Sequence, residues 1–462
     1  MIDFTTEDFL DAEFNKELSI YGNREGTLKF PLDKPIPLNA ISKIVKFRVK
    51  GRNNKLTKNR LPIISLLTAN AISLVGNVLS AIAIPWFVLQ TTGSATQTGI
   101  TGFFTVLPVV LAGFLGGTLV DRLGYKRTSI IADLASGFTV ALIPLLYFTI
   151  GLEFWQLMVL VFLGALLDAP GSTARNALVP ELAALAQIPI ERATFLIHII
   201  ERSARLVGAP LSGLLIAWVG TENVLWLNAA SFFISAGIIG VAIKGQEPRH
   251  PDEEKRQNGK YIEELREGLR FIYNDRLMLA IVIMIMLTNF MDAIFSGVVQ
   301  PVFVKQVYGQ ALDLGLLIAA NGGGAVIGAV LFSGFGPRLP RHAVFVFGFV
   351  LTSLRFFLYA TYPPLWVAIV FVVISSIGAG PLNPIIGAVE YERIPKNMRG
   401  RVGGAIGAGA WSAMPLGMLV GGVLTEELGV RSMLIGLGII YLITTSSMAF
   451  IPAMKEMNRR NL

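Results

Sequence analysis

The chain has 462 residues, of which 53% are hydrophobic and only 15% are charged. This composition excludes an ordinary soluble domain, because one soluble core does not need so much apolar surface, and it indicates a membrane protein with several spans. The formal net charge of +8 does not indicate a nucleic-acid partner, since the Lys and Arg residues lie in short segments beside apolar runs. The chain has no cysteine, which excludes disulfides and thiolate chemistry.

Residues 1–60 contain no apolar run that could span a membrane. The segment from Asp3 to Glu17 contains six acids, whereas residues 42–60 contain eight Lys or Arg and no acid. A basic segment of this kind favours the cytoplasmic face of a membrane, next to anionic lipid. We therefore expect residues 1–60 to form a cytoplasmic N-terminal extension without a cleavable signal peptide, so that the first span acts as the signal.

Twelve apolar runs follow this extension, and each is long enough for a transmembrane helix, which needs about 20 residues. The runs cover residues 61–90, 98–120, 128–150, 154–174, 193–219, 223–244, 277–304, 312–335, 342–361, 365–389, 402–424 and 431–453. Most basic residues between the runs lie in the connections on the same side as the N-terminus. In the connections on the opposite side, Lys305 is the one basic residue. The positive-inside bias therefore predicts that both termini are cytoplasmic.

The longest connection, residues 245–276, contains eight acids and seven basic residues and separates six runs from six. It divides the chain into two expected six-helix halves, residues 61–244 and 277–453, with a short cytoplasmic tail at 454–462. Apolar residues recur at helical spacing between Tyr261 and Ile272, which predicts an amphipathic helix on the membrane surface. Two repeated halves around a central site are the usual plan of secondary transporters.

A dense cluster of charges lies in the short connection between the second and third runs. The residues that fit a fixed pattern there are Gly117, Leu119, Asp121, Arg122, Gly124, Lys126 and Arg127. At these positions the chain resembles the signature loop of the major facilitator superfamily, which reads G-x-L-x-D-R-x-G-x-K/R-R. The resemblance implies an all-α membrane protein with twelve transmembrane helices in two pseudo-symmetric six-helix halves.

The same resemblance implies a conformational latch on the cytoplasmic side. Asp121 is expected to bind the start of the eleventh helix, at Arg401, when that side is closed. Arg122 is expected to reach Asp168 at the end of the fourth helix. The corresponding loop of the second half, near Arg338, has no acid, so the latch should be one-sided. The predicted latch residues are Gly117, Asp121, Arg122, Gly124, Lys126, Arg127 and Asp168.

A second stretch of sequence narrows the resemblance to one branch of the superfamily. The segments that carry it are Asp168-Ala-Pro-Gly-Ser-Thr-Ala-Arg175 and Glu201-Arg-Ser-Ala-Arg205-Leu-Val-Gly208. They are similar to the third drug:proton antiporter family, which contains macrolide-efflux and enterobactin-export proteins. Many relatives carry an acid in the first helix, whereas this chain has Asn77 at that place, so a first-helix carboxylate cannot carry protons here.

No hydrolytic or redox site is visible in the sequence. The three histidines lie far apart without the spacing of a metal site, and no glycine loop carries a Walker lysine. We therefore expect no enzymatic activity, no cofactor and no metal ion. A transporter without a nucleotide motif must draw on an ion gradient or a substrate gradient.

Charged residues inside the apolar runs cost about 2.5 to 3.5 kcal/mol each on insertion scales, so they are candidate functional groups. Glu201 and Arg205 lie one helical turn apart on the fifth run. They either contact substrate or gate the cytoplasmic half of the cavity, or they form a structural ion pair. Asp292 lies near the middle of the seventh run and either carries protons or pairs with a cation such as Arg355. Asp133 and Asp168 are expected near cytoplasmic helix ends, where loop arginines would bind them. The candidate cavity residues are Arg205, Asn77, Asn289 and Arg355, and the candidate proton-coupling residues are Asp292 and Glu201.

Together these observations predict a monomeric multi-pass transporter of the inner (cytoplasmic) membrane, surrounded by lipid. It would export a hydrophobic or amphipathic small molecule, such as a drug or macrolide, by alternating access and in exchange for protons. A siderophore exporter and a lysophospholipid transporter are alternatives with the same fold. An alternative of another class is a transport-inactive membrane sensor that uses residues 1–60 as its output.

Overall fold

The computed structural model describes residues 59–243 and 261–458, with the backbone alone at 113–122, 261–262 and 337. The chain divides into two units, of which the larger consists of Leu61–Ala184 and Ile188–Leu462. All that follows concerns this larger unit. Nearly all of the predicted N-terminal extension, residues 1–60, lies outside the described residues, as do the first part of the linker and the last residues of the predicted tail.

The first half of the chain forms six long helices. In five of them the apolar residues are distributed around the helix surface rather than along one stripe, as expected where one face meets protein and the other meets lipid, and α7 is more one-sided. Gly124 and Gly220 separate consecutive helices and have φ of +80° and +87°, a region that favours glycine. The helices are α3 (Leu61–Thr92), α4 (Ala95–Leu123), α5 (Tyr125–Thr149), α6 (Phe154–Ala186), α7 (Ile190–Val219) and α8 (Thr221–Ala242).

The second half begins with the short helix α9 and continues with six spans, three of which are divided. The seventh span contains a π-helical turn, η3, and the tenth and eleventh spans are each divided next to a proline, Pro381 and Pro415. The elements are α9 (Tyr261–Asn274), α10 (Arg276–Ile294), η3 (Phe295–Val299), α11 (Gln300–Val307), α12 (Ala311–Phe335), η4 (Gly336–Arg338), α13 (Arg341–Ala360), α14 (Leu365–Ala379), α15 (Leu382–Arg393), α16 (Arg399–Ser412), α17 (Met414–Leu428), α18 (Val430–Ser447) and η5 (Pro452–Asn458).

The predicted all-α class and the predicted spans are confirmed. No strand occurs among the described residues, and eleven of the spans there are long and apolar enough to cross a membrane. The remaining predicted span, the fifth, corresponds to α7, which carries Glu201, Arg202 and Arg205 near its middle. These charges lower its apolar character, although α7 is as long as its neighbours.

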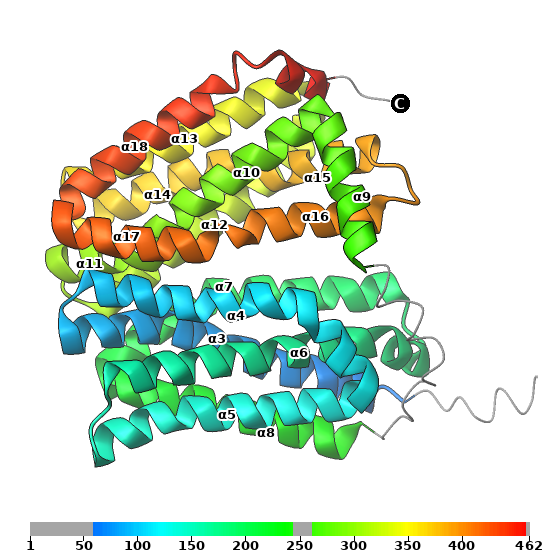
Figure 1. Ribbon diagram of the computed structural model, residues 1–462, viewed down its shortest axis with the longest axis vertical. Helices are drawn as coiled ribbons and strands as arrows, with labels where there is room; N and C mark the ends of the chain where they lie inside the picture. Colours follow the sequence, from blue (N-terminus) through cyan, green and yellow to red (C-terminus); the bar gives the residue numbers. More distant parts are fainter. Residues whose placement is uncertain (1–58, 244–260, 459–462) are drawn as a thin grey trace, which may run out of the picture. The chain divides into compact units, whose positions relative to one another are not determined.

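Each half packs around its own helix pairs, and a few helices meet across the boundary between the halves (Figure 1). Within the first half α3 and α5 pack on α8, and within the second half α12 packs on α14 and α13 on α18. Across the boundary α4 packs on α17 and α7 packs on α12. We call the end of the bundle at which α3 meets α4, residues 93–94, the far end. The opposite end, at which α8 ends and α9 begins, is the linker end.

The fourth span differs from the prediction in its length. We expect it to end at residue 174, but α6 continues to Ala186. The charge on Arg175 does not end the helix, because its side chain is only 2% exposed and lies 2.5 Å from Asp133. Asp168 is therefore the fifteenth of 33 residues in α6, near its middle, and not at a helix end.

Candidate functional site

A cavity of about 490 Å³ lies between the two halves. Helices α3, α4, α5, α6 and α8 line it from the first half, and η3, α11, α12 and α17 line it from the second half. This volume is within the range of small-molecule binding sites. Most of the lining side chains are apolar, including Ile82, Val106, Val109, Val140, Phe232, Ile318 and Met418.

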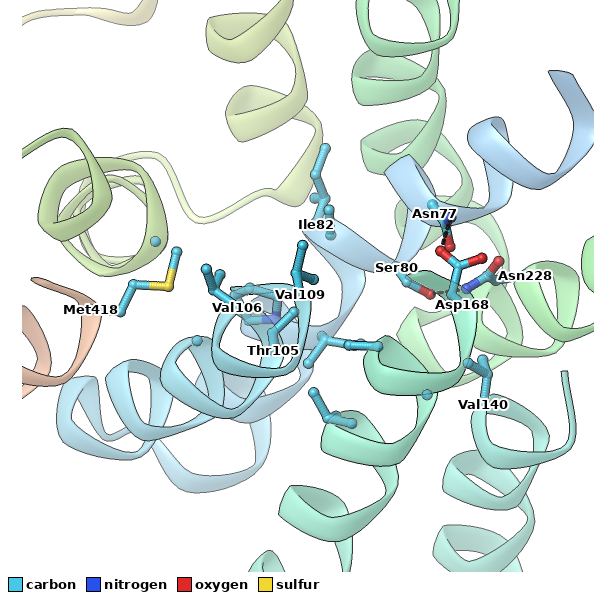
Figure 2. A pocket seen from close by; sticks show the side chains of 18 of the residues that line it. Asn77, Ser80, Ile82, Thr105, Val106, Val109, Val140, Asp168, Asn228 and Met418 are labelled. Carbon is cyan, nitrogen blue, oxygen red and sulfur yellow. Dashed lines mark hydrogen bonds between the residues drawn. The ribbon is translucent and has the colours of Figure 1, made fainter. Parts of the chain in front are cut away.

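One corner of the cavity is polar (Figure 2). The amide of Asn77 on α3 donates a hydrogen bond of 2.9 Å to Asp168 Oδ2 on α6. Beside them, the amide of Asn228 on α8 donates a hydrogen bond to the hydroxyl of Ser80 on α3. Asp168 is the one ionisable side chain among the described residues that line the cavity. We call Asn77, Ser80, Asp168 and Asn228 the polar corner.

Behind the polar corner, two carboxylates share one guanidinium group. Arg175 lies 2.5 Å from Asp133 Oδ1 and 3.5 Å from Asp168 Oδ1. The hydroxyl of Ser235 on α8 donates a further hydrogen bond of 2.6 Å to Asp133 Oδ2. Asp133 is fully buried, Arg175 is 2% exposed and Asp168 is 22% exposed. As expected, an arginine next to the fourth run binds both acids, but Arg175 lies within α6 and not in a loop, and Asp168 lies near the middle of that helix. The expected contact of Arg122 with Asp168 stays a prediction, because the side chain of Arg122 lies outside the described residues.

Two predicted site residues, Asn77 and Asp168, thus meet at the cavity although the sequence suggests different roles for them. Asn289 lies elsewhere, since its amide on α10 donates a hydrogen bond of 2.9 Å to the carbonyl of Ala410 on α16. The arrangement lets Asn77 orient the Asp168 carboxylate. Within the described residues no three His, Asp or Glu side chains are grouped so that they could hold a metal ion.

Asp292 and Arg355 form the ion pair that the sequence allows. Arg355 Nη2 on α13 donates to Asp292 Oδ1, and the hydroxyl of Tyr441 on α18 lies 3.5 Å from Asp292 Oδ2. The guanidinium carbon of Arg355 is also 4.9 Å and 4.8 Å from the ring centres of Phe295 and Phe356. Neither member of the pair lines the cavity. The proton-carrying role of Asp292 stays a prediction.

The predicted ion pair between Glu201 and Arg205 is wrong. Glu201 lies 3.4 Å from the Nδ1 atom of His198, one turn earlier on α7, and Arg205 is exposed. A spacing of four residues permits a pair but does not require it, and a partner at three residues competes for the same carboxylate. Further along the same face, the hydroxyl of Ser212 donates a hydrogen bond of 3.0 Å to the carbonyl of Leu79 on α3. That part of the face therefore packs on protein.

Part of the predicted latch cannot be placed, because Gly117, Asp121 and Arg122 lie in the segment whose backbone alone is described. At the start of α5, Lys126 donates a hydrogen bond of 2.9 Å to the carbonyl of Gly240 on α8. At the start of α16, Arg401 lies 2.6 Å from Glu267 of α9. The contact of Asp121 with the start of α16 therefore stays a prediction.

At the far end, hydrogen bonds join the two halves through residues that the sequence does not single out. Glu426 at the end of α17 accepts hydrogen bonds from the backbone N–H groups of Ala95 and Thr96 and from the hydroxyl of Ser94. Lys305 of α11 donates to the carbonyl of Leu89 on α3. No sequence pattern reveals the partners of Glu426 and Lys305, because each partner lies in the other half of the chain.

The backbones of the two halves also come very close at the far end. A methyl group added to Gly99 on α4 would lie 2.5 Å from the carbonyl oxygen of Met418 on α17 and 2.7 Å from the Cα atom of Gly422. A methyl group on Gly213 of α7 would lie 2.6 Å from the carbonyl oxygen of Ala311 at the start of α12. Only glycine fits such contacts without a shift of the backbone.

Comparison with known proteins identifies the family. The profile of the family described as transmembrane secretion effector matches residues 60–462. The multidrug efflux pump Tap of Mycobacterium tuberculosis is 31% identical over 403 residues, which cover 87% of this chain and 96% of the relative. Macrolide efflux protein A of Streptococcus pyogenes is 21% identical over 380 residues, which cover 80% and 91%.

Solved transporter structures share the fold at low sequence identity. The nucleoside transporter NupG has a TM-score of 0.65 and 14% identity, covering 84% of this chain and 98% of NupG. A bacterial homologue of the human lysosomal transporter Spinster has a TM-score of 0.64 and 12% identity, covering 87% and 98%. The matching profile and the efflux relatives place the chain among membrane transporters. The chain belongs to the transmembrane secretion effector family of the major facilitator superfamily.

Proposed function

We propose that this protein exports amphipathic small molecules from the cell by alternating access, in exchange for protons. The observation that carries the proposal is the cavity between the halves, which combines apolar walls with one polar corner. A molecule that is partly apolar and partly polar is complementary to such a lining. The printed names of the relatives, a multidrug efflux pump and a macrolide efflux protein, support a drug-like substrate.

The distribution of basic residues supports an orientation in which the linker end faces the cytoplasm. Among the described connections, those at the linker end contain most Lys and Arg, whereas those at the far end contain Lys and Arg only at their edges, as Lys305 and Arg431. By the positive-inside bias, the linker end and both chain termini are then cytoplasmic, and the far end faces outward.

The contacts between the halves support an inward-facing state. Hydrogen bonds from Glu426 and Lys305 join the first half to the second at the far end. The close approach of Gly99 to Gly422 lies at the same end. The far end is therefore the closed end, and substrate would enter the cavity from the linker end. Outward release requires that these contacts open while the linker end closes.

Transport by purified protein in liposomes with an imposed pH gradient tests the proposal. The panel contains a macrolide, an amphipathic dye, a catecholate siderophore and a lysophospholipid, so that the alternative substrates compete directly. We expect accumulation of the macrolide or the dye, driven by the gradient and abolished by a protonophore. Accumulation that persists after the proton gradient collapses would exclude proton exchange as the driving reaction. If no compound of the panel is transported, the proposed efflux function is contradicted.

A further inference from the structure

We propose that Asp168 binds a positively charged group of the exported molecule, and that a proton occupies the same carboxylate when the molecule is absent. The proposal rests on the function proposed above and names its substrate class, an amphipathic molecule with a single positive charge. It is carried by the geometry of the buried group formed by Asp133, Arg175 and Asp168, which we call the charge triad.

The charge triad is unbalanced. Two carboxylates, Asp133 and Asp168, face one guanidinium group, at 2.5 Å and 3.5 Å respectively. When all three groups are ionised, the triad carries a net charge of −1. A net charge in a site with little exposure is costly unless a counter-charge is present. The pair of Asp292 and Arg355 in the second half has no such surplus, since one acid faces one base.

The surplus charge is located at Asp168 and not at Asp133. Asp133 accepts hydrogen bonds from Arg175 and Ser235 and is fully buried. Asp168 accepts one hydrogen bond, from Asn77, among the described residues, and its Oδ1 atom is buried without a hydrogen bond. An ionised carboxylate can accept about four hydrogen bonds. Asp168 therefore has unused acceptor capacity, and it is the member of the triad that lines the cavity.

No described base near the cavity supplies the missing charge. Helix α3 presents Asn77 and Ser80, α8 presents Asn228 and Ser235, and the elements of the second half present neutral side chains such as Ser296 and Met418. The described lining residues of α4 are also neutral. On α5, Lys126 and Arg127 lie at the helix start, seven and six residues before Asp133, and Lys126 binds the carbonyl of Gly240. Glu181, the next acid on α6, lies thirteen residues beyond Asp168, about 20 Å along the helix.

The rest of the cavity determines the shape of the molecule. The polar corner lies on one side, and the apolar side chains of Val106, Val109 and Met418 lie away from it (Figure 2). A molecule whose charged group reaches Asp168 would place its apolar body against these side chains. Burial of that body contributes about 25 cal/mol per Å² of apolar surface, so the charge provides selectivity and the apolar wall provides much of the affinity.

Exchange at a single carboxylate fixes the charge balance of transport. In the inward-facing state a cation binds to Asp168 and displaces its proton into the cytoplasm. After the halves rearrange, the cation leaves to the outside and a proton from the outside binds to the same carboxylate. Each cycle exports one monovalent cation and imports one proton, so no net charge crosses the membrane. The side chain of Asn77 is neutral, so its hydrogen bond to Asp168 does not affect this charge balance.

Ethidium, a permanent amphipathic cation, and Nile red, a neutral dye, test the proposal with the purified full-length protein. In weakly buffered solution with a pH indicator, we expect close to one proton released for each ethidium bound and none for Nile red. Asp168→Asn should bind ethidium at least about tenfold more weakly, which corresponds to about 1.4 kcal/mol. It should release no proton and should still bind Nile red, which shows that the cavity is intact.

Two further variants keep the result interpretable. Asp168→Glu retains the charge and should restore proton release on ethidium binding. Glu427→Gln removes an exposed acid at the far end and should behave as the unmodified protein. Proton release that survives in Asp168→Asn but disappears in Asp292→Asn would overturn the proposal and assign the exchange to Asp292.

Transport measurements separate this proposal from the proposed function. If the unmodified protein in liposomes transports neither dye under a pH gradient, the proposed efflux function fails. If it transports ethidium and Asp168→Asn transports ethidium equally well, efflux stands and the Asp168 site fails. Transport of ethidium by the unmodified protein that changes with membrane voltage at constant pH gradient would contradict the one-for-one exchange.

Discussion

Replacing Glu426 by glutamine should weaken the closure of the two halves at the far end. Glu426 belongs to α17 of the second half, and its carboxylate accepts hydrogen bonds from Ser94, Ala95 and Thr96 of the first half. It thereby satisfies N–H groups at the start of α4 that have no partner within that helix. Its negative charge also lies at the positive end of the α4 dipole. Glutamine keeps the shape and one acceptor oxygen but removes the charge.

The expected effect is about 0.5 to 1.5 kcal/mol, because glutamine keeps one acceptor oxygen and loses only part of the capping contribution. A side chain that caps a helix N-terminus contributes about 0.5 to 2 kcal/mol. The charge contributes about 0.3 to 1 kcal/mol at an exposed helix end, and Glu426 is exposed, so the lower part of that range applies. Since the contact forms when the far end is closed, this loss shifts the equilibrium towards the outward-open state by a factor of about 2 to 10.

Cysteine labelling measures this shift, because the chain has no cysteine of its own. A Thr105→Cys change places one thiol on the α4 wall of the cavity. A membrane-impermeant maleimide is added from the far side of oriented vesicles. We expect the thiol to react several-fold faster when Glu426→Gln is also present, because the far end opens more often.

The neighbouring exposed acid supplies a matched control. Glu427→Gln removes the same charge one residue later, and labelling in this variant should proceed at the rate of the Thr105→Cys protein alone. Equal labelling rates in the Glu426 and Glu427 variants, with equal amounts of folded protein, would refute the closure that we assign to Glu426.

Three further changes test other parts of the structure. With proton exchange at Asp168, Asp292→Asn should retain transport driven by a pH gradient; loss of this transport with retained substrate counterflow would assign the proton to Asp292 instead. Arg175→Met leaves the buried Asp133 and the partly exposed Asp168 without their shared cation and should cost about 3 to 5 kcal/mol of stability; thermal unfolding in detergent measures this, and an unchanged melting temperature would contradict the charge triad. Gly99→Leu should slow transport without preventing substrate binding, because a side chain would collide with Met418 and Gly422 when the far end closes; unimpaired turnover would show that this close approach is not needed.

The fold could be predicted from the sequence because the bilayer imposes a strict length on each span. About 20 apolar residues are needed to cross it, and the charged connections separate the runs clearly. The exceptions have local causes. Helix α7 carries charges near its middle, and α6 continues through Arg175 because a partner on another helix neutralises that charge.

The candidate site could be predicted only in part. Asn77 and Asp168 are both recognisable as polar residues within or beside apolar runs, but their meeting at one corner depends on how α3 and α6 are arranged. The shared use of Arg175 by two acids could not be predicted, because Asp133 is 42 positions away on α5. The predicted pairing of Glu201 with Arg205 is incorrect for a different reason. Regular spacing on one helix permits several partners, so it does not identify the one that binds.

The π-helical turn η3 affects the geometry of the whole seventh span. A π-turn contains one residue more than the corresponding α-turn. Within η3, the hydroxyl of Ser296 donates a hydrogen bond of 2.7 Å to the backbone carbonyl of Asp292. Each residue of an α-helix advances the chain by about 100° of rotation. Conversion of η3 to a regular turn would therefore rotate α11 by about 100° relative to α10. Lys305 would then turn away from Leu89 at the far end, while Asp292 would keep its place beside Arg355.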